Sequence, residues 1–569
     1  MRKYLNSTSL LYSCFFIMLF MMLFAKYVNF EPICAGAIKQ ILHPEYPAGK
    51  LFYDPHHNHD YIVAFATKLF GCRDDLTYIA WFFWFLEMAF SILVLIKICN
   101  FVFKRNRLVL TIAVMFFIIS RSGEVDQKTM LLPIYFTAIY FFLKERWLVS
   151  ALLGASIFYL HVGYAIWWFL PSSFALLVIS LIHKRAALKK VINYVLVVIA
   201  CSSPIIYFYL NRIGSAGMDK FSVRYYYYVC GGTSSILLSL RNPAVLVYPM
   251  LMVAIFLAGY SKARKEGYKN NNIMPIAVGV FATYIATFIF ADLAGNGAVI
   301  TLQLLRSTVN IEFFSSLFFA FLLAKQIERG DYTFFLSFVI LRQFYYIFFI
   351  KIMRNVDYYS AANVLYFIFL IYVIFENRLK KGASKGNQLL QRPIVIALFL
   401  ILVTAPRPVM LKSCIKSILH IPQANSGAAV WTAHDYLRKD IAKFTNEQMA
   451  DKNTLLLIPF DETDFVYYTK HKVFITWFTP IENHTYKGQS SYEFENILKD
   501  DLKYPPEKLF SNSDFHKQWQ GLWRGLKEDT IRLWKQKYNV THVVREKELP
   551  LNFPILYENQ FYVVYEIDC

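Results

Sequence analysis

The stretch YIAWFFWFLEMAFSILVLIKICNFVF, from Tyr78 to Phe103, decides the fold class of this chain. It is long and apolar, and the basic segment KRNR at Lys104–Arg107 follows it directly. A helix needs about 20 predominantly apolar residues to cross a hydrocarbon core of about 30 Å, and this stretch is longer than that. A basic segment after an apolar span is typical of the cytoplasmic side. We therefore predict a transmembrane helix that ends at a cytoplasmic turn.

Apolar runs of this kind recur from Leu10 to about Ala405, and they account for the composition of the chain. Of 569 residues, 57% are hydrophobic and only 17% are charged, whereas a soluble domain carries roughly 25% charged residues. The formal net charge is +20, but much of the basic excess lies in short loops between the apolar runs. Positive-inside topology explains these loops, so we expect a lipid bilayer around the chain and no nucleic-acid partner.

The alternation of apolar runs and basic loops predicts an α-helical polytopic membrane protein with about thirteen transmembrane helices in residues 1–410. Arg2 and Lys3 precede the first span, Leu10–Val28, which places the N-terminus in the cytoplasm. The composition changes at about Leu411. Residues 411–569 are therefore predicted to form a soluble α/β domain on the extracytoplasmic side.

Shorter elements of the membrane part are also predicted. Asp60–Phe70 has the period of an amphipathic helix on the membrane surface, with its apolar face made by Ile62, Phe65, Ala66, Leu69 and Phe70. Leu108–Ser120 and Leu131–Leu143 form a pair of short spans, and the run that begins at Leu148 breaks at His161.

In the C-terminal part, apolar runs of the length of strands alternate with helical stretches. The predicted strands are Leu455–Ile458, Val473–Trp477 and His542–Val544, and the predicted helical stretches lie near Tyr492–Leu502 and Leu522–Tyr538. The segment Ile555–Ile567 is predicted to form a hairpin around Glu558-Asn559.

The first large loop contains the polar segment PEYPAGKLFYDPHHNHD at Pro44–Asp60. Asp54 and Asp60 flank three histidines, of which His57 is the central one. Carboxylates beside imidazoles can act as a general base, bind a divalent metal ion or orient a phosphate. The alternative is an ordinary turn at Asp54-Pro55 with solvated histidines. The eight scattered cysteines contain no CxxC pair, so no structural metal site is expected from them.

Further candidate residues lie on the same predicted side of the membrane. Glu124 and Asp126 form a second carboxylate pair between two short spans, and His161 interrupts an apolar run. Arg306 lies near the outer end of its span, where a guanidinium can bind phosphate or extend to the interface. Arg224, beside four tyrosines, can bind phosphate or stack against a sugar, although aromatic residues are common at membrane interfaces.

Together these features resemble the GT-C superfamily of polytopic glycosyltransferases, in particular its mannosyltransferase-like bacterial branch. The resemblance lies in the acidic first loop, the paired short spans, LHVGY at Leu160–Tyr164, LQLLR at Leu302–Arg306, and the terminal segment PILYENQFYVVYEI. It implies a polyprenyl-phosphate-linked sugar donor and inverting transfer to a lipid or glycan acceptor on the outer face of the plasma (inner) membrane.

The resemblance also implies roles for single residues. Asp54 or Asp60 would be the catalytic base, Glu124 or Asp126 a supporting carboxylate, and Arg306 a contact to the donor phosphate. The loop lacks the adjacent acidic pair of the family, which leaves the choice between Asp54 and Asp60 open. The competing hypotheses are a glycan polymerase or ligase, a transporter of lipid-linked substrates, and a GT-C-like protein that has lost catalysis.

Overall fold

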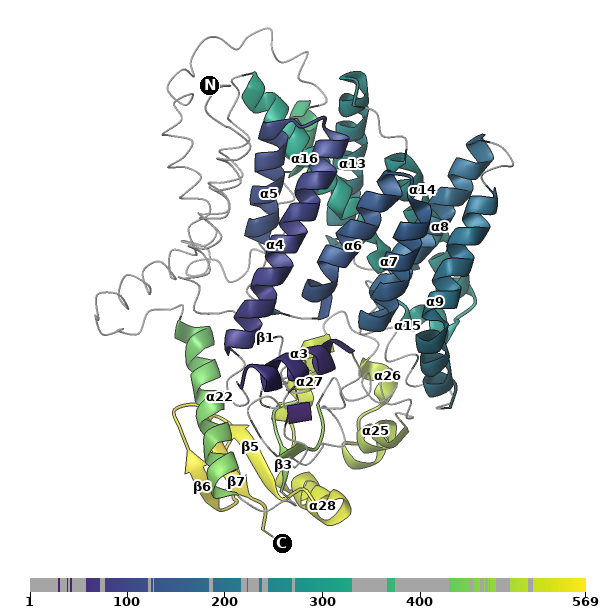
Figure 1. Ribbon diagram of the computed structural model, residues 1–569. Coiled ribbons are helices and arrows are strands. Elements are labelled where there is room, and N and C mark those ends of the chain that lie inside the picture. The colour runs from purple at the N-terminus through teal and green to yellow at the C-terminus, as the bar shows by residue number, and fades with distance from the viewer. Residues whose placement is uncertain are drawn as a thin grey trace, which may run out of the picture.

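The computed structural model describes the part of the chain that contains the bundle helices and most of the C-terminal domain (Figure 1). The described residues are 29–30, 38, 41–42, 58–71, 77–120, 124–125, 127–183, 188–215, 223, 235–237, 244–268, 272–329, 366–373, 429–449, 454–460, 465, 469, 471–476, 492–509 and 515–568.

Long apolar helices make up the membrane part, as the sequence predicts. The main helices are α4 (Thr77–Val102), α5 (Arg107–Ser120), α6 (Gln127–Leu143), α7 (Trp147–Leu160), α8 (Val162–His183), α9 (Leu188–Ser215), α13 (Ala244–Lys265), α14 (Ile273–Thr287) and α16 (Thr308–Glu328). Between α14 and α16 lie the π-helix η2 (Phe288–Leu293), the short helix α15 (Gly297–Thr301) and the 3-10 turn η3 (Leu304–Ser307).

Within the described residues, five helices are long and apolar enough to cross a membrane. Their spans are Phe82–Val102, Val162–Ile182, Leu188–Tyr207, Ile273–Leu293 and Leu304–Glu328. These helices indicate a membrane protein. The predicted spans Leu10–Val28, Phe334–Phe349 and Pro393–Thr404 lie outside the described residues, so the total of thirteen stays a prediction.

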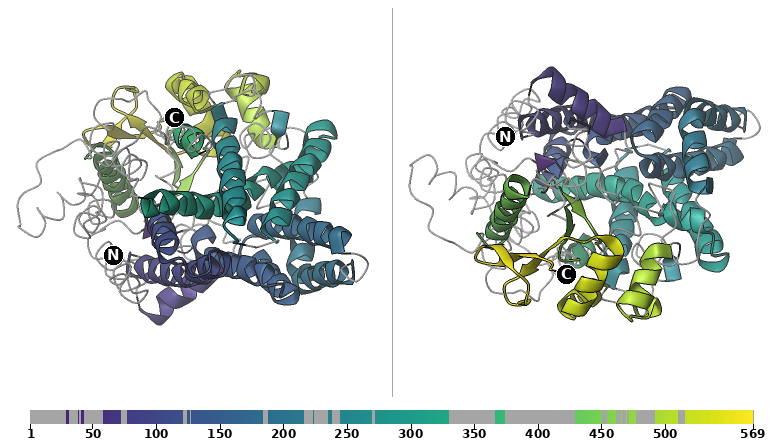
Figure 2. Two further views of the ribbon diagram at one scale, coloured as in Figure 1. Left: turned by 90° about the horizontal axis from the view of Figure 1, so that it is seen from above. Right: turned by 90° about the horizontal axis from the view of Figure 1, so that it is seen from below.

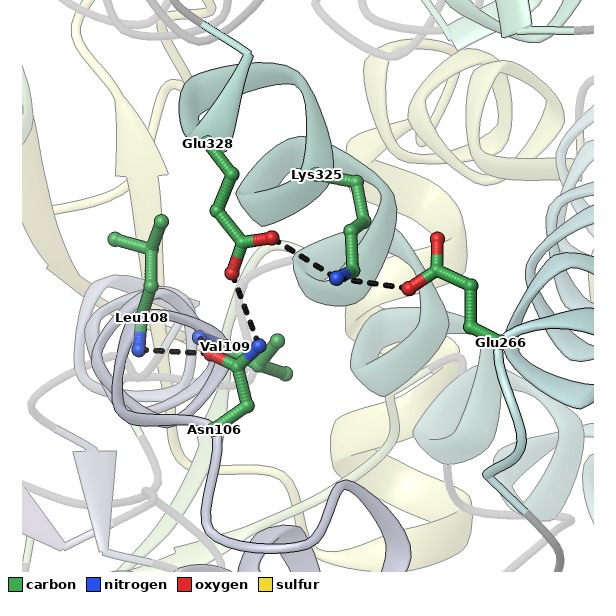
Figure 3. A network of polar contacts seen from close by, with 6 residues as sticks. All are labelled: Asn106, Leu108, Val109, Glu266, Lys325 and Glu328. Carbon is green, nitrogen blue, oxygen red and sulfur yellow. Dashed lines mark hydrogen bonds and ion pairs between the residues drawn. The ribbon is translucent and has the colours of Figure 1, made fainter.

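Basic turns gather at the end of the bundle opposite the C-terminal domain (Figure 1), and polar contacts join them (Figure 3). Asn106 accepts hydrogen bonds from the first amides of α5, and its amide group donates to Glu328 at the end of α16. Lys325 pairs with Glu328 at 2.9 Å and with Glu266, just beyond α13, at 2.8 Å. The α4–α5 turn and the ends of α13 and α16 therefore lie together, as the predicted alternation requires.

Two glycines allow close crossings between helices in the bundle. A Cβ atom at Gly279 of α14 would overlap the carbonyl group of Pro171 in α8. A Cβ atom at Gly259 of α13 would overlap the side chain of Phe318 in α16. At Gly279 the neighbouring atoms belong to the backbone, so no rotamer change can make room there.

Helix α3 (Asn58–Leu69) lies across the lower end of the bundle in Figure 1, where it contacts α4 and α7. It confirms the helix predicted over Asp60–Phe70. Val63 and Ala64 are completely buried, whereas Phe65 and Leu69 are 69% and 71% exposed. Ile62 and Phe70 are also exposed, and Ala66 is half-buried and packs on the bundle.

The C-terminal domain contains a five-stranded sheet in the order β4-β3-β5-β7-β6. The strand β3 (Leu455–Leu457) is parallel to β4 (Lys472–Val473) and β5 (His542–Glu546). The strands β7 (Tyr562–Glu566) and β6 (Ile555–Glu558) continue the sheet antiparallel to β5 and to each other. The domain is therefore α/β in the described residues, as predicted.

Three details of the C-terminal prediction can be compared with the structure. The hairpin is confirmed, because Asn559 accepts hydrogen bonds from the amides of Phe561 and Tyr562 at its turn. The strand predicted over Val473–Trp477 is too long, since β4 ends at Val473. The stretch Leu522–Tyr538 is divided between α27 (Phe515–Arg524) and α28 (Glu528–Tyr538). The division falls where Gly525 follows α27, a usual residue type after a helix end.

The remaining helices of the domain pack on the two faces of the sheet. They are α22 (Ala429–Gln448), α25 (Tyr492–Asn496), η7 (Ile497–Asp501) and α26 (Pro506–Leu509), together with α27 and α28. One face is covered by a core that contains Trp519, Trp523 and Trp534, and this core also includes Ala291 of η2 and Ile300 of α15. The domain and the end of the bundle therefore share apolar contacts. The predicted boundary near residue 411 lies outside the described residues.

His542, at the start of β5, is expected to make the C-terminal domain less stable in acid. Burial lowers the pKa of His542 below the ordinary value of 6.5, His471 and Lys535 lower it further, and Glu566 opposes them. The unfolded histidine therefore binds its proton at a higher pH than the folded one. Stability is fully present above that ordinary value and decreases as the pH falls through it.

Thermal unfolding followed by tryptophan fluorescence between about pH 7.5 and about pH 5 checks this effect of His542. The variant His542→Gln cannot take up the proton, so it should lose this part of the pH dependence. An unchanged pH dependence in the variant would assign the acid sensitivity to other groups.

Candidate functional site

The break between α7 and α8 places a histidine at the end of the bundle nearer the C-terminal domain (Figure 1). His161 has an extended backbone, with φ −158° and ψ 106°. Its Nδ1 atom accepts a hydrogen bond of 3.3 Å from the amide of Tyr164, in the first turn of α8. The predicted break at His161 is confirmed. Since Nδ1 is the acceptor, a neutral His161 ring carries its proton on Nε2.

His161 and Arg306, two of the residues singled out from the sequence, lie on the same indole ring. The centroid of the His161 ring is 6.0 Å from that of Trp167, and Tyr164 lies 4.7 Å from Trp167. The guanidinium carbon of Arg306 is 5.6 Å from the centroid of the Trp167 ring. We call His161, Tyr164, Trp167 and Arg306 the Trp167 cluster. It joins the start of α8 to the turn that precedes α16.

The backbone around Arg306 is held in place from several sides. The indole Nε1 of Trp167 donates a hydrogen bond of 2.9 Å to the carbonyl oxygen of Leu302. Gln303 has φ 48° and ψ 50°, the left-handed conformation, which costs a residue other than glycine about 1–3 kcal/mol. The 3-10 turn η3 follows and carries Arg306. Left-handed residues of this kind cluster at functional sites.

Asn310 is the buried amide that connects this turn to two other helices. It is completely buried. Its Oδ1 accepts a hydrogen bond of 2.8 Å from the hydroxyl of Tyr135 in α6. Its Nδ2 donates to the carbonyl oxygens of Trp167 at 2.8 Å and Ser307 at 3.1 Å. Asn310 therefore links the backbone of Trp167 to the turn that carries Arg306.

Arg306 is half-buried, and among the described residues no carboxylate forms an ion pair with it. A guanidinium within about 6 Å of the centroid of an indole ring contributes about 0.5–2 kcal/mol. A planar guanidinium is suited to two-point binding of a phosphate. The cluster thus combines a cation for an anionic group with flat aromatic surfaces.

Two segments that carry predicted acidic residues, one in the first loop and one in the α5–α6 turn, lie at this end of the bundle. Asp60 lies in the first turn of α3 and is only 1% exposed. The strand β1 (Asn29–Phe30) pairs in parallel with β2 (Glu124–Val125), with Asn29 opposite Glu124. The start of the first loop therefore lies beside the turn that carries Glu124. Asp54, His57, Asp126 and Arg224 lie outside the described residues.

A second polar contact at this end fixes the loop between α9 and α13. The carboxylate of Asp292, in η2, accepts hydrogen bonds from the hydroxyl of Ser235 and from the amide of Ile236, the latter at 2.9 Å. Asp292 therefore anchors a segment of that loop. Viewed from below in Figure 2, the C-terminal domain lies to one side of this end of the bundle and α3 to the other.

Sequence reasoning missed Trp167, Asn310 and Gln303 as parts of the site. Trp167 lies in the apolar run of α8, where a tryptophan is expected in the core. Asn310 follows Arg306 by one helical turn. Two polar residues at that spacing within a span indicate a polar site, so this pattern could have identified Asn310. Nothing local in the sequence indicates the left-handed Gln303.

No group of three or more His, Cys, Asp or Glu side chains that could hold a metal ion occurs in the described part of the chain. A divalent metal ion, left open by the composition of the first loop, stays a prediction. No protein-family model matches the sequence, and no curated protein matches it.

Proposed function

We propose that this protein is a membrane glycosyltransferase that moves a sugar from a polyprenyl-phosphate-linked donor to a lipid or glycan acceptor at the end of the bundle that faces the C-terminal domain. The observation that carries the proposal is Arg306, whose guanidinium carbon lies 5.6 Å from the centroid of the Trp167 ring, beside His161, and which has no carboxylate partner in the described residues. The donor combines a phosphate, a sugar and an apolar chain. The Trp167 cluster offers a cation and aromatic surfaces at the end of a bundle of apolar helices.

In the proposed reaction, the acceptor hydroxyl attacks the anomeric carbon of the donor sugar. The bond between this carbon and the phosphate oxygen breaks, and polyprenyl phosphate leaves with the bonding electron pair. Arg306 stabilises the negative charge on the leaving phosphate, and the N–H of His161 at Nε2 donates a second hydrogen bond to it. The proton of the acceptor goes to a carboxylate, for which Asp54 and Asp60 are the candidates.

The aromatic residues of the cluster are assigned to binding the donor. A sugar ring or the first isoprene unit presents a flat apolar face to Trp167 and Tyr164. Because Asn310 and Leu302 fix the position of Trp167, the rings are held in place before the donor binds. A positioned site loses little conformational freedom on binding.

The variant Arg306→Gln is expected to release polyprenyl phosphate at least about tenfold more slowly than the unmodified protein, because roughly 1.4 kcal/mol of charge stabilisation is lost. Membranes that contain the protein would be given a panel of polyprenyl-phosphate sugars. Release of polyprenyl phosphate would be followed by mass spectrometry, which requires no knowledge of the acceptor beyond its presence in the membrane extract that is added.

Arg329→Gln is the matched control, since Arg329 is an exposed arginine just beyond the other end of α16. It should leave the rate unchanged. Arg306→Lys should recover part of the rate, because it keeps the charge without the planar group. Movement of the intact donor across the membrane without release of polyprenyl phosphate would favour a transporter and contradict the proposal.

A further inference from the structure

A cavity of about 360 Å³ lies between helices α4, α6 and α7, away from the Trp167 cluster. Its walls are almost entirely apolar, and the residues that matter here are Phe83, Glu87, Phe90, Pro133, Thr137 and Leu153. The volume is about twelve times the roughly 30 Å³ that one water molecule occupies in the liquid. Since a methylene group is of similar size, the cavity is large enough for much of one hydrocarbon chain.

The cavity lies beside apolar side chains that are exposed on two of its helices. Phe90, in its wall, is 55% exposed, and Leu93 on the same helix is 50% exposed. On α7, Leu152 is 52% exposed while its neighbour Leu153 lines the cavity. Large apolar side chains exposed on a membrane helix are covered by lipid. A chain from the surrounding bilayer can therefore enter from the side.

The walls also contain features that a plain packing gap lacks. Glu87 is only 3% exposed, and it follows Thr77, the first residue of α4, by ten positions. The membrane-spanning part of α4 begins at Phe82, so at about 1.5 Å per residue Glu87 lies roughly 7.5 Å inside the hydrocarbon core, about half the depth of one leaflet. Ionisable residues at that depth are costly and usually functional.

Helix α6 contributes a proline to the same wall. Pro133 has no amide hydrogen, so the helix lacks the hydrogen bond that would reach the carbonyl oxygen of Thr129. The hydroxyl of Thr137 donates to a different carbonyl oxygen, that of Pro133, at 2.6 Å. The hydroxyl oxygen of Thr137 stays available as an acceptor, so the cavity has a small polar region within an apolar wall.

We propose that this cavity is a binding site for one hydrocarbon chain of a membrane lipid, which lies against Phe83, Phe90 and Leu153 with its middle beside Glu87. The site is separate from the proposed donor site, because it is built from α4, α6 and α7 at membrane depth. It does not depend on the proposed glycosyl transfer. A lipid chain bound in this cavity would fill the space between α4, α6 and α7.

A photoreactive phospholipid tests this proposal. The probe carries a diazirine near the middle of one acyl chain, and the purified full-length protein is illuminated in micelles that contain it. Light releases nitrogen, and the carbene that forms inserts into the O–H bond of a protonated carboxyl to give an ester. Peptide mass spectrometry should find the label on Glu87 and on the neighbouring cavity residues of α4, in preference to the other exposed helices.

Leu153→Trp and Leu152→Trp form a matched pair, because the same indole is added at neighbouring positions of α7. Leu153→Trp fills the cavity and should lower the labelling of α4 at least fivefold, whereas Leu152→Trp should leave it unchanged. Thermal unfolding of both variants shows whether they are folded. Even labelling of all lipid-facing helices, or equal labelling in the two folded variants, would overturn the proposal. If Leu153→Trp fails to fold, Ile134→Trp, at another cavity position, replaces it in the comparison.

Discussion

Replacing Gly279 with alanine is expected to destabilise the bundle by about 3 kcal/mol or more, at the upper end of the cost of overpacking. The new Cβ atom would lie 2.8 Å from the carbonyl carbon of Pro171 and closer still to its oxygen. Both atoms belong to the backbone of α8, so α8 and α14 must move apart. Thermal unfolding in detergent and the yield of monodisperse protein measure the effect.

Gly154→Ala is the control for this prediction. Gly154 also lies in an apolar helix of the bundle, but its added Cβ atom would meet Trp168 Cδ1 at 3.4 Å, which is an ordinary contact. We expect its free energy of unfolding to change by less than about 0.5 kcal/mol. Equal stabilities of the two variants would show that α8 and α14 are not packed as closely as described.

Replacing Asn310 with alanine is expected to cost about 2–3 kcal/mol and to disorder the Trp167 cluster. The substitution leaves the Tyr135 hydroxyl and the carbonyl oxygens of Trp167 and Ser307 without their present partner. Hydrogen bonds between membrane helices contribute about 0.6 kcal/mol on average and up to about 1.7 kcal/mol each, and three are lost together. Thermal unfolding measures the cost, and the rate of polyprenyl phosphate release reports on the position of Arg306.

Tyr135→Phe is the graded comparison for Asn310, because it removes one of the three hydrogen bonds and keeps the aromatic ring. Its cost should be about 0.6–1.7 kcal/mol, clearly below that of Asn310→Ala. If the two variants were equally stable, the hydrogen bonds from Asn310 to Trp167 and Ser307 would contribute nothing to the free energy of unfolding. The proposed role of Asn310 in positioning Trp167 would then be wrong.

Elements that depend on local patterns could be predicted from the sequence. The helices around Tyr78–Phe103 and the break at His161 follow from runs of apolar residues and their interruption. The helix after Asp60 and the hairpin at Asn559 follow from periodicity and turn residues. In each of these cases the residues that determine the structure are neighbours in the chain, so no knowledge of the tertiary fold is needed.

Contacts between distant segments could not be predicted in the same way. No sequence pattern links Arg306 with Trp167. They come together only because α8 crosses the segment before α16. The parallel pairing of Asn29 with Glu124 is likewise a consequence of how the helices are arranged. Ala66 is half-buried because α3 contacts two helices of the bundle, which a period within one segment does not reveal.

The structure describes only some of the acidic residues that the sequence singles out. Asp60 is buried at the start of α3, Glu124 is known only as a position in β2, and Asp54 and Asp126 lie outside the described residues. The choice of the base between Asp54 and Asp60 therefore stays as the sequence left it. The distances described above belong to the part of the proposed site that holds the cation and the aromatic rings, which is the Trp167 cluster.

The shared apolar core between the bundle end and the C-terminal domain has a consequence for biosynthesis. Ala291 and Ile300 belong to the same core as Trp519 and Trp534, yet the ribosome makes the first pair long before the second. Domains generally fold from the N-terminus during synthesis. Until the C-terminal domain has been made, η2 and α15 therefore lack the apolar contacts that this domain provides. Release of the finished C-terminus then completes the membrane part, and a chain that stops early leaves a surface open to aggregation or proteolysis.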